Sequence, residues 1–151
     1  GELTDIILKL IKSLQTQKLL AERLKTLLKV LEISQDSGAD DKQVKKLLDE
    51  IRKLVEKIEK LARKQTKLVE KLLKKGPGND IILKLIKSLQ TQKLLAERLK
   101  TLLKVLEISQ DSGADDKQVK KLLDEIRKLV EKIEKLARKQ TKLVEKLLKK
   151  D

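Results

Sequence analysis

The chain has 151 residues, with 38 Lys or Arg against 24 Asp or Glu and a formal net charge of +14. It contains no His, Cys, Met, Trp, Tyr or Phe, which excludes disulfides, imidazole bases, thiolate nucleophiles, His or Cys metal sites and aromatic platforms for bases. No apolar run approaches the roughly 18 residues of a membrane span, so we expect no membrane span. The remaining composition is typical of long helices.

The sequence consists of one block of 71 residues written twice. Residues 5–75 recur without change as residues 80–150, with the linker 76–79 between the two copies. We therefore predict one domain over residues 1–151, built from two identical helical hairpins with internal pseudo-two-fold symmetry. Identical halves also leave open a domain-swapped arrangement, in which hairpins from different chains pair.

Each copy divides into two predicted helices. Apolar residues recur three and four apart over residues 5–34 and again over 41–75, with a polar turn between them. Neither strand alternation nor a hairpin turn appears. Because short connections make consecutive helices antiparallel, the predicted fold is all-α, an up-down-up-down four-helix bundle. The first and third helices are then diagonal partners, as are the second and fourth.

The predicted helix ends carry capping signals. Thr4 is expected to cap the first helix, and Gly38 to close it in the left-handed conformation. Asp40, with Gln43 three residues on, predicts a capping-box variant at the start of the second helix. Asn79 takes the place of Thr4 before the third helix. These signals fix where each predicted helix starts and stops.

The apolar positions of both helices form a heptad seam with a neighbouring row, the pattern of a face that packs into a bundle core. The seam of the first helix consists of Leu3, Ile6, Leu10, Ser13, Gln17, Leu20, Leu24, Leu27 and Leu31, and its row of Ile7, Leu14, Ala21 and Leu28. The seam of the second helix consists of Val44, Leu47, Ile51, Leu54, Ile58, Leu61, Gln65, Leu68 and Leu72, and its row of Leu48, Val55, Ala62 and Val69.

Six polar residues interrupt the predicted seams. They are Ser13, Gln17 and Gln65, with their copies Ser88, Gln92 and Gln140. Folding the hairpin brings Gln65 to the level of Ser13 and Gln17. Since buried amides and hydroxyls are costly unless paired, we expect one closed hydrogen-bond network that fixes the register of the helices. The alternative is a polar-ligand or proton-transfer site, and it lacks any group among the six that titrates near neutral pH.

The chain resembles a class of de novo designed helical bundles with buried hydrogen-bond networks, in which two helical hairpins pair as a C2 homodimer. The resemblance rests on this Ser and Gln pattern and on residues 20–25 (LAERLK) and 58–65 (IEKLARKQ), and it covers both copies. It implies a bundle fold, two hairpins fused into a single chain, and no natural activity. The first helix departs from the class because its outer surface is less polar.

The first helix carries a second apolar row on its outer side, which we call the outer stripe. At 100° per residue its members lie within about 60° of one direction. They are Leu8, Ile11, Gln15, Leu19, Thr26, Val30 and Ile33, and in the second copy Leu83, Ile86, Gln90, Leu94, Thr101, Val105 and Ile108. The second helix has no such row. Aligned aliphatic residues are typical of an interface, although scattered surface aliphatics are also normal.

The outer stripe predicts a chain whose partner is itself, in a homo-oligomer, array or lattice. The alternatives are a soluble monomeric scaffold, or weak non-specific binding of nucleic acid or membrane surfaces through the positive charge, with no specific nucleic-acid partner. Carboxylates such as Asp49 and Glu56 lie beside Lys and Arg, as solvated ion pairs do. We therefore expect no catalytic, cofactor-binding or metal-binding residues, no enzyme activity and no small-molecule ligand. The sequence assigns no localisation beyond that of a soluble synthetic chain suited to expression in the bacterial cytoplasm.

Overall fold

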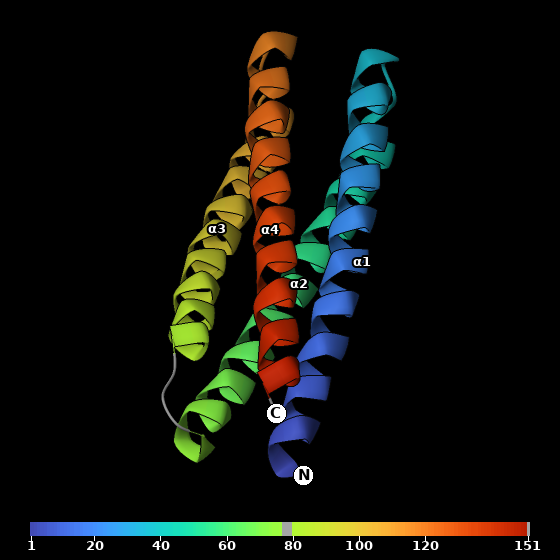
Figure 1. The fold of residues 1–151 in the computed structure, drawn as a ribbon. Helices are drawn as coiled ribbons and strands as arrows, with labels where there is room; N and C mark the ends of the chain where they lie inside the picture. The colour runs from blue at the N-terminus through green and yellow to red at the C-terminus, as the bar shows by residue number, and fades with distance from the viewer. Residues whose placement is uncertain (77–79, 151) are drawn as a thin grey trace.

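The computed structural model is a bundle of four long helices and describes residues 1–76 and 80–150 (Figure 1). The helices are α1 (Glu2–Asp36), α2 (Asp41–Lys75), α3 (Asp80–Asp111) and α4 (Asp116–Lys150). Within the described ranges, α1 packs against α2 and α4, and α3 packs against the same two helices, while the backbones of the diagonal pairs α1–α3 and α2–α4 do not approach one another as closely. The predicted all-α four-helix bundle with this diagonal arrangement is confirmed.

The first helix starts earlier than predicted. α1 begins at Glu2, with Gly1 at the N-cap and no side-chain cap, so the assignment of Thr4 as the cap is wrong. The amide of Asp5 donates instead to the carbonyl of Gly1 at 3.1 Å. Glu2 and Asp5 place two carboxylates in the first turn, where negative charge stabilises the helix N-terminus. Asn79, the predicted cap of α3, lies outside the described residues.

The turn between α1 and α2 follows the predicted capping chemistry. Gly38 has a φ of +72°, the left-handed region in which glycine carries no steric penalty. The amide of Ala39 reaches back to the carbonyl of Ser34 at 2.9 Å. Asp40 caps α2, because its Oδ1 accepts from the amide of Gln43 at 2.9 Å. The second copy repeats these features, including a φ of +72° at Gly113.

The core consists of two apolar clusters, and each cluster draws on all four helices. We call the one beside the interhelical turns the loop-end cluster, which includes Leu24, Ile51 and Ile58 with their copies. The other, the terminal-end cluster, includes Leu10, Leu14 and their copies. Between the clusters along the helices lie four buried glutamines and four buried alanines: Gln17, Gln65, Gln92, Gln140, Ala21, Ala62, Ala96 and Ala137.

The neighbouring row of each helix is as deeply buried as half of the predicted seam. On α2, the members of that row are buried to between 0% and 6% exposure, and every second seam position is buried to between 0% and 4%, whereas Leu47, Leu54, Leu61 and Leu68 of the predicted seam are only partly buried. Each helix packs against two neighbours, so the middle of its apolar face points at the bundle axis and the edge positions stay half-exposed. The core face is therefore centred between the neighbouring row and the buried half of the predicted seam.

Replacing the left-handed glycine tests this turn. A Cβ at Gly38 meets no atom within 4 Å, so the cost of Gly38→Val comes from φ alone and amounts to about 1–2 kcal/mol. Gly38→Asn is expected to cost much less, because asparagine tolerates this conformation. Guanidinium denaturation followed by circular dichroism measures both variants. Equal stability of the two variants would contradict this account of the turn.

Candidate functional site

The outer stripe lies on the surface of α1 and is repeated on α3. Leu8, Leu19, Val30 and Ile33 are 50%, 67%, 41% and 62% exposed, and their copies Leu83, Leu94, Val105 and Ile108 are 55%, 66%, 39% and 61% exposed. Gln15, Thr26, Gln90 and Thr101 are exposed between them. α1 is therefore apolar on two sides, one in the core and one in solvent.

Two stripe positions differ from the rest. Ile11 and its copy Ile86 are partly buried, because they lie at the edge of the stripe and pack against the terminal-end cluster. Leu73 of α2 and its copy Leu148 of α4 are each 37% exposed. The hydroxyl of Thr26 donates to the carbonyl of Glu22 at 3.1 Å, which satisfies the hydroxyl within its own helix.

The buried glutamines form one hydrogen-bonded triad in each copy. The Nε2 of Gln65 donates to the Oγ of Ser13 and to the Oε1 of Gln17, both at 2.9 Å. The Nε2 of Gln140 makes the same two bonds, to Ser88 at 2.8 Å and to Gln92 at 3.0 Å. All four glutamines are at most 1% exposed, and the serines are half-buried. The predicted meeting of Gln65 with Ser13 and Gln17 is thus present.

The triads do not join into the closed network that the sequence predicts. The Nε2 of Gln17 and the Oε1 of Gln65 are buried and have no hydrogen-bond partner, and the same holds for Gln92 and Gln140. Each triad therefore retains one donor group and one acceptor group in an apolar core, where an unpaired polar atom costs about 1–3 kcal/mol. The Nε2 of Gln65 donates both of its hydrogens, so the unpaired acceptor of the triad is the Oε1 of Gln65, and the unpaired donor is the Nε2 of Gln17.

The sequence pattern did not predict the ion pairs that join the two hairpins. The guanidinium of Arg52 bridges Asp49 of its own helix and Glu107 of α3, and Arg127 bridges Asp124 and Glu32 in the same way. The Nζ of Lys25 lies 3.1 Å from Glu134. A single helix gives no signal for such pairs, because their partners come from a helix in the other copy. They tie α1 to α4 and α2 to α3.

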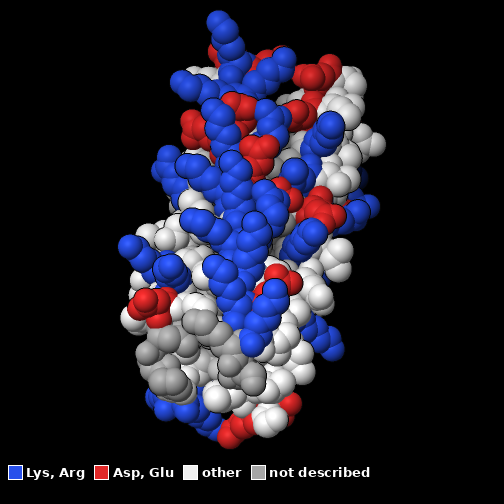
Figure 2. Space-filling view, viewed as in Figure 1, with Lys and Arg blue, Asp and Glu red and all other residues white. Residues whose placement is uncertain are grey.

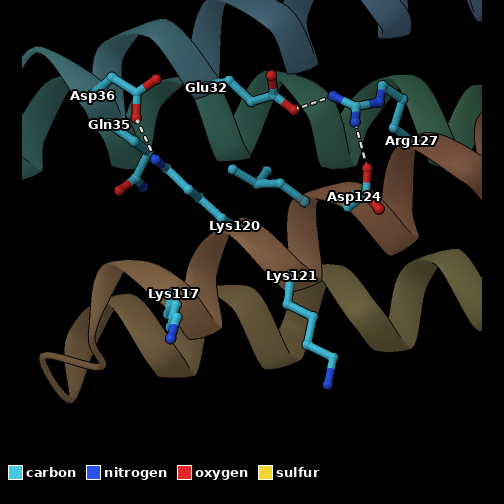
Figure 3. Close-up of a pocket in the computed structure, with 9 residues that line it drawn as sticks. Glu32, Gln35, Asp36, Lys117, Lys120, Lys121, Asp124 and Arg127 are labelled. Carbon is cyan, nitrogen blue, oxygen red and sulfur yellow. Dashed lines mark hydrogen bonds and ion pairs between the residues drawn. The ribbon is translucent and has the colours of Figure 1, made fainter.

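A charged groove runs between α1 and α4 near the turns (Figure 3). Its volume is about 460 Å³, and the corresponding α2–α3 groove measures about 620 Å³. In this groove, the guanidinium of Arg127 forms ion pairs with Glu32 and Asp124, and the Nζ of Lys120 lies 3.6 Å from the Oδ1 of Asp36. Its lining is Glu32, Gln35, Asp36, Lys117, Lys120, Lys121, Leu123, Asp124 and Arg127. Four cations against three carboxylates, most of them paired, give little net charge to attract a ligand.

The net charge is confined to one half of the molecule. Residues 24–56 and their copies 99–131, which we call the loop half, each hold seven basic and seven acidic residues. The rest of the sequence, the terminal half, holds 24 basic and 10 acidic residues and so carries the whole net charge of +14. Figure 2 shows this on the face centred on α4, where red mixes with blue near the turns and blue predominates below.

The described residues offer little for catalysis or for metal chemistry. Across residues 1–76 and 80–150, no group of three or more acidic side chains is placed to hold a metal ion. Along the same ranges, no helix combines the length and apolar character that a bilayer span needs. The hydroxyls of the half-buried serines face glutamine amides, which are not bases.

Comparison with known proteins identifies the fold. No protein-family model matches the chain, and no curated protein matches it. Among solved structures, the chain is similar to a "De novo designed two-domain di-Zn(II) and porphyrin-binding protein", with a TM-score of 0.67 and 21% identity, over 96% of this chain and 92% of that one. At this identity the similarity establishes a shared helical-bundle fold.

Substitutions in the triad test its energetics. Gln65→Leu leaves Ser13 and the Oε1 of Gln17 without their donor, so the free energy of unfolding should fall by about 1–3 kcal/mol. Replacing the whole triad (Ser13→Ala, Gln17→Leu, Gln65→Leu) removes every polar atom, and stability should return to the parent value or exceed it. Chemical denaturation measures both. A triple variant less stable than Gln65→Leu would show that the triad stabilises the fold.

Proposed function

We propose that this chain is a designed structural building block that self-associates through its outer stripes. The observation that carries the proposal is the row of aliphatic side chains on α1 and α3, led by Leu19 and Leu94 at 67% and 66% exposure. The similarity to a designed bundle and the unchanged repeat of 71 residues support a designed origin. The two hairpins are then a two-fold pair joined into one chain by the linker 76–79.

The energetics of one stripe favour association only modestly. Fully burying five branched aliphatic side chains is worth roughly 7–15 kcal/mol, and association costs about 4–15 kcal/mol in lost freedom and ordering. One contact is thus weak to moderate. Two stripes in each chain allow contacts to reinforce one another in a larger assembly.

The placement of the stripes determines the kind of assembly. α1 and α3 are diagonal helices of the bundle, so their outer faces point away from each other (Figure 1). If each stripe pairs with a stripe of another copy, every molecule has two neighbours. Such contacts extend into a row or lattice, or close into a ring when the contact is tilted.

The side chains of this chain do not favour the zinc and porphyrin binding for which the similar designed protein is named. This chain has no histidine and no cysteine, the side chains that most often ligate zinc and haem iron. Its buried polar side chains are glutamines that hydrogen-bond within the triads. A structural role therefore suits these residues better than cofactor binding.

A charge placed within each stripe should abolish association. Leu19→Glu with Leu94→Glu removes the most exposed aliphatics and buries a carboxylate in any contact. We expect the association constant to fall at least about 100-fold, equivalent to roughly 2.7 kcal/mol. Light scattering and analytical ultracentrifugation over a range of concentrations measure this.

The matched control changes the net charge by the same amount, at positions outside the outer stripes. Lys60 and Lys135 are exposed on α2 and α4 and have no ion-pair partner among residues 1–76 and 80–150. Lys60→Gln with Lys135→Gln also lowers the net charge by two, and association should persist. A parent protein that stays a monodisperse 17.3 kDa monomer at high concentration would refute the proposed function.

A second candidate function follows from the charge of the terminal half. Its 24 basic residues face only 10 acidic ones, which favours weak, sequence-independent binding of double-stranded DNA. Six Lys→Gln substitutions there should weaken binding more than six in the loop half, at equal net charge. The terminal-half set is Lys64, Lys67, Lys71, Lys139, Lys142 and Lys146; the loop-half set is Lys42, Lys46, Lys53, Lys117, Lys121 and Lys128.

Fluorescence anisotropy with a labelled duplex at several salt concentrations measures this binding. The parent and the loop-half variant should lose affinity steeply with salt, and the terminal-half variant should show a shallower slope because it neutralises fewer phosphates. Equal slopes for the two variants would contradict the role of the terminal half.

A further inference from the structure

The spacing between the positions of the outer stripe is the same from either end of the helix. With Glu22 included, its positions are 8, 11, 15, 19, 22, 26, 30 and 33, and the steps between them are 3, 4, 4, 3, 4, 4 and 3. The row is therefore symmetric about a point between residues 20 and 21.

The chemistry of the stripe follows the same symmetry at its outer positions. Reversal places Leu8 opposite Ile33, Ile11 opposite Val30, and Gln15 opposite Thr26, so apolar side chains meet apolar ones and polar side chains meet polar ones. At the centre, reversal places Leu19 opposite Glu22, whereas a parallel contact places each Leu19 and each Glu22 opposite its own copy. The side-chain pattern therefore permits an antiparallel contact at six of the eight positions.

The charge distribution distinguishes the two orientations. A parallel contact sets the terminal half of one molecule, with its net charge of +14, beside the identical half of its neighbour. An antiparallel contact sets each terminal half beside a neutral loop half. Like charges within a Debye length of about 8 Å repel, so the parallel contact carries an electrostatic cost that the antiparallel contact avoids.

We propose that neighbouring molecules meet through their outer stripes in antiparallel orientation, with the Leu8 end of one stripe on the Ile33 end of the next. This rests on the proposed self-association and specifies its geometry. A two-fold axis perpendicular to the helices then relates the two molecules. Successive bundles alternate in direction along the assembly, so basic halves and neutral halves also alternate.

Disulfide trapping tests the orientation directly, because the chain has no cysteine of its own. The background variant carries Leu94→Glu, which disables the α3 stripe and limits assembly to pairs through α1. Leu8→Cys and Ile33→Cys are each introduced into this background. The two proteins are oxidised separately and as an equimolar mixture, and mass spectrometry identifies the linked cysteines.

The antiparallel contact predicts that the mixture forms the 8–33 heterodimer, in excess of either homodimer by about tenfold. Leu8→Cys alone should remain largely unlinked. If Leu8→Cys alone forms a disulfide-linked homodimer as readily as the mixture forms the 8–33 heterodimer, the antiparallel orientation is overturned, and self-association still holds. No linkage in any sample, together with a parent protein that is monomeric by light scattering at high concentration, would overturn both the orientation and the proposed function.

Discussion

Burial of aliphatic side chains is the interaction on which the whole molecule depends. The sequence has no cysteine and no aromatic ring, so neither disulfides nor ring stacking contribute. Residues such as Leu24, Ile51 and Leu99 reach 0% exposure only because all four helices surround them. One hairpin alone would leave part of this surface in water, because α1 also packs against α4 and α2 against α3. The pairing of the two copies therefore follows from the core, and the pairing in turn decides which faces of α1 and α3 remain outside.

Much of the fold could be predicted from local patterns. Gly38 and Asp40 mark the turn because left-handed backbone and amide capping are local requirements that act within a few residues. Which of two adjacent leucines on α2 is buried is a different kind of question. Leu47 and Leu48 are equally apolar, and only the presence of two neighbouring helices places Leu48 at the bundle axis. The start of α1 at Glu2 likewise depends on how far an acidic first turn extends the helix without a side-chain cap.

The candidate site, like the fold, was predictable only where a pattern within one hairpin determines it. Hairpin register alone brings Gln65 to Ser13 and Gln17, since it depends only on the position of the turn. The lack of a bond between the two triads depends on how two hairpins approach, which no single-helix pattern contains. The same is true of Arg52 and Glu107, which lie in different copies. Ile11 belongs to the stripe by its angle, yet it packs partly on the core because it lies at the edge of that face.

The triad has one further consequence, for the rotation of α1 about its own axis. α1 is apolar on two opposite sides, so a half-turn would still offer aliphatic side chains to the core, with Leu19 and Ile33 taking the place of buried leucines. Such a rotation leaves the helix itself intact, but it exchanges nine buried apolar side chains for five aliphatic ones and carries Glu22 inward, so apolar burial favours the observed side. Gln65 distinguishes the two orientations, because only the observed one supplies the oxygens of Ser13 and Gln17 to its amide. A few polar atoms in the core thus add to apolar burial in selecting which side of a two-sided helix faces inward, and thereby which side remains outside.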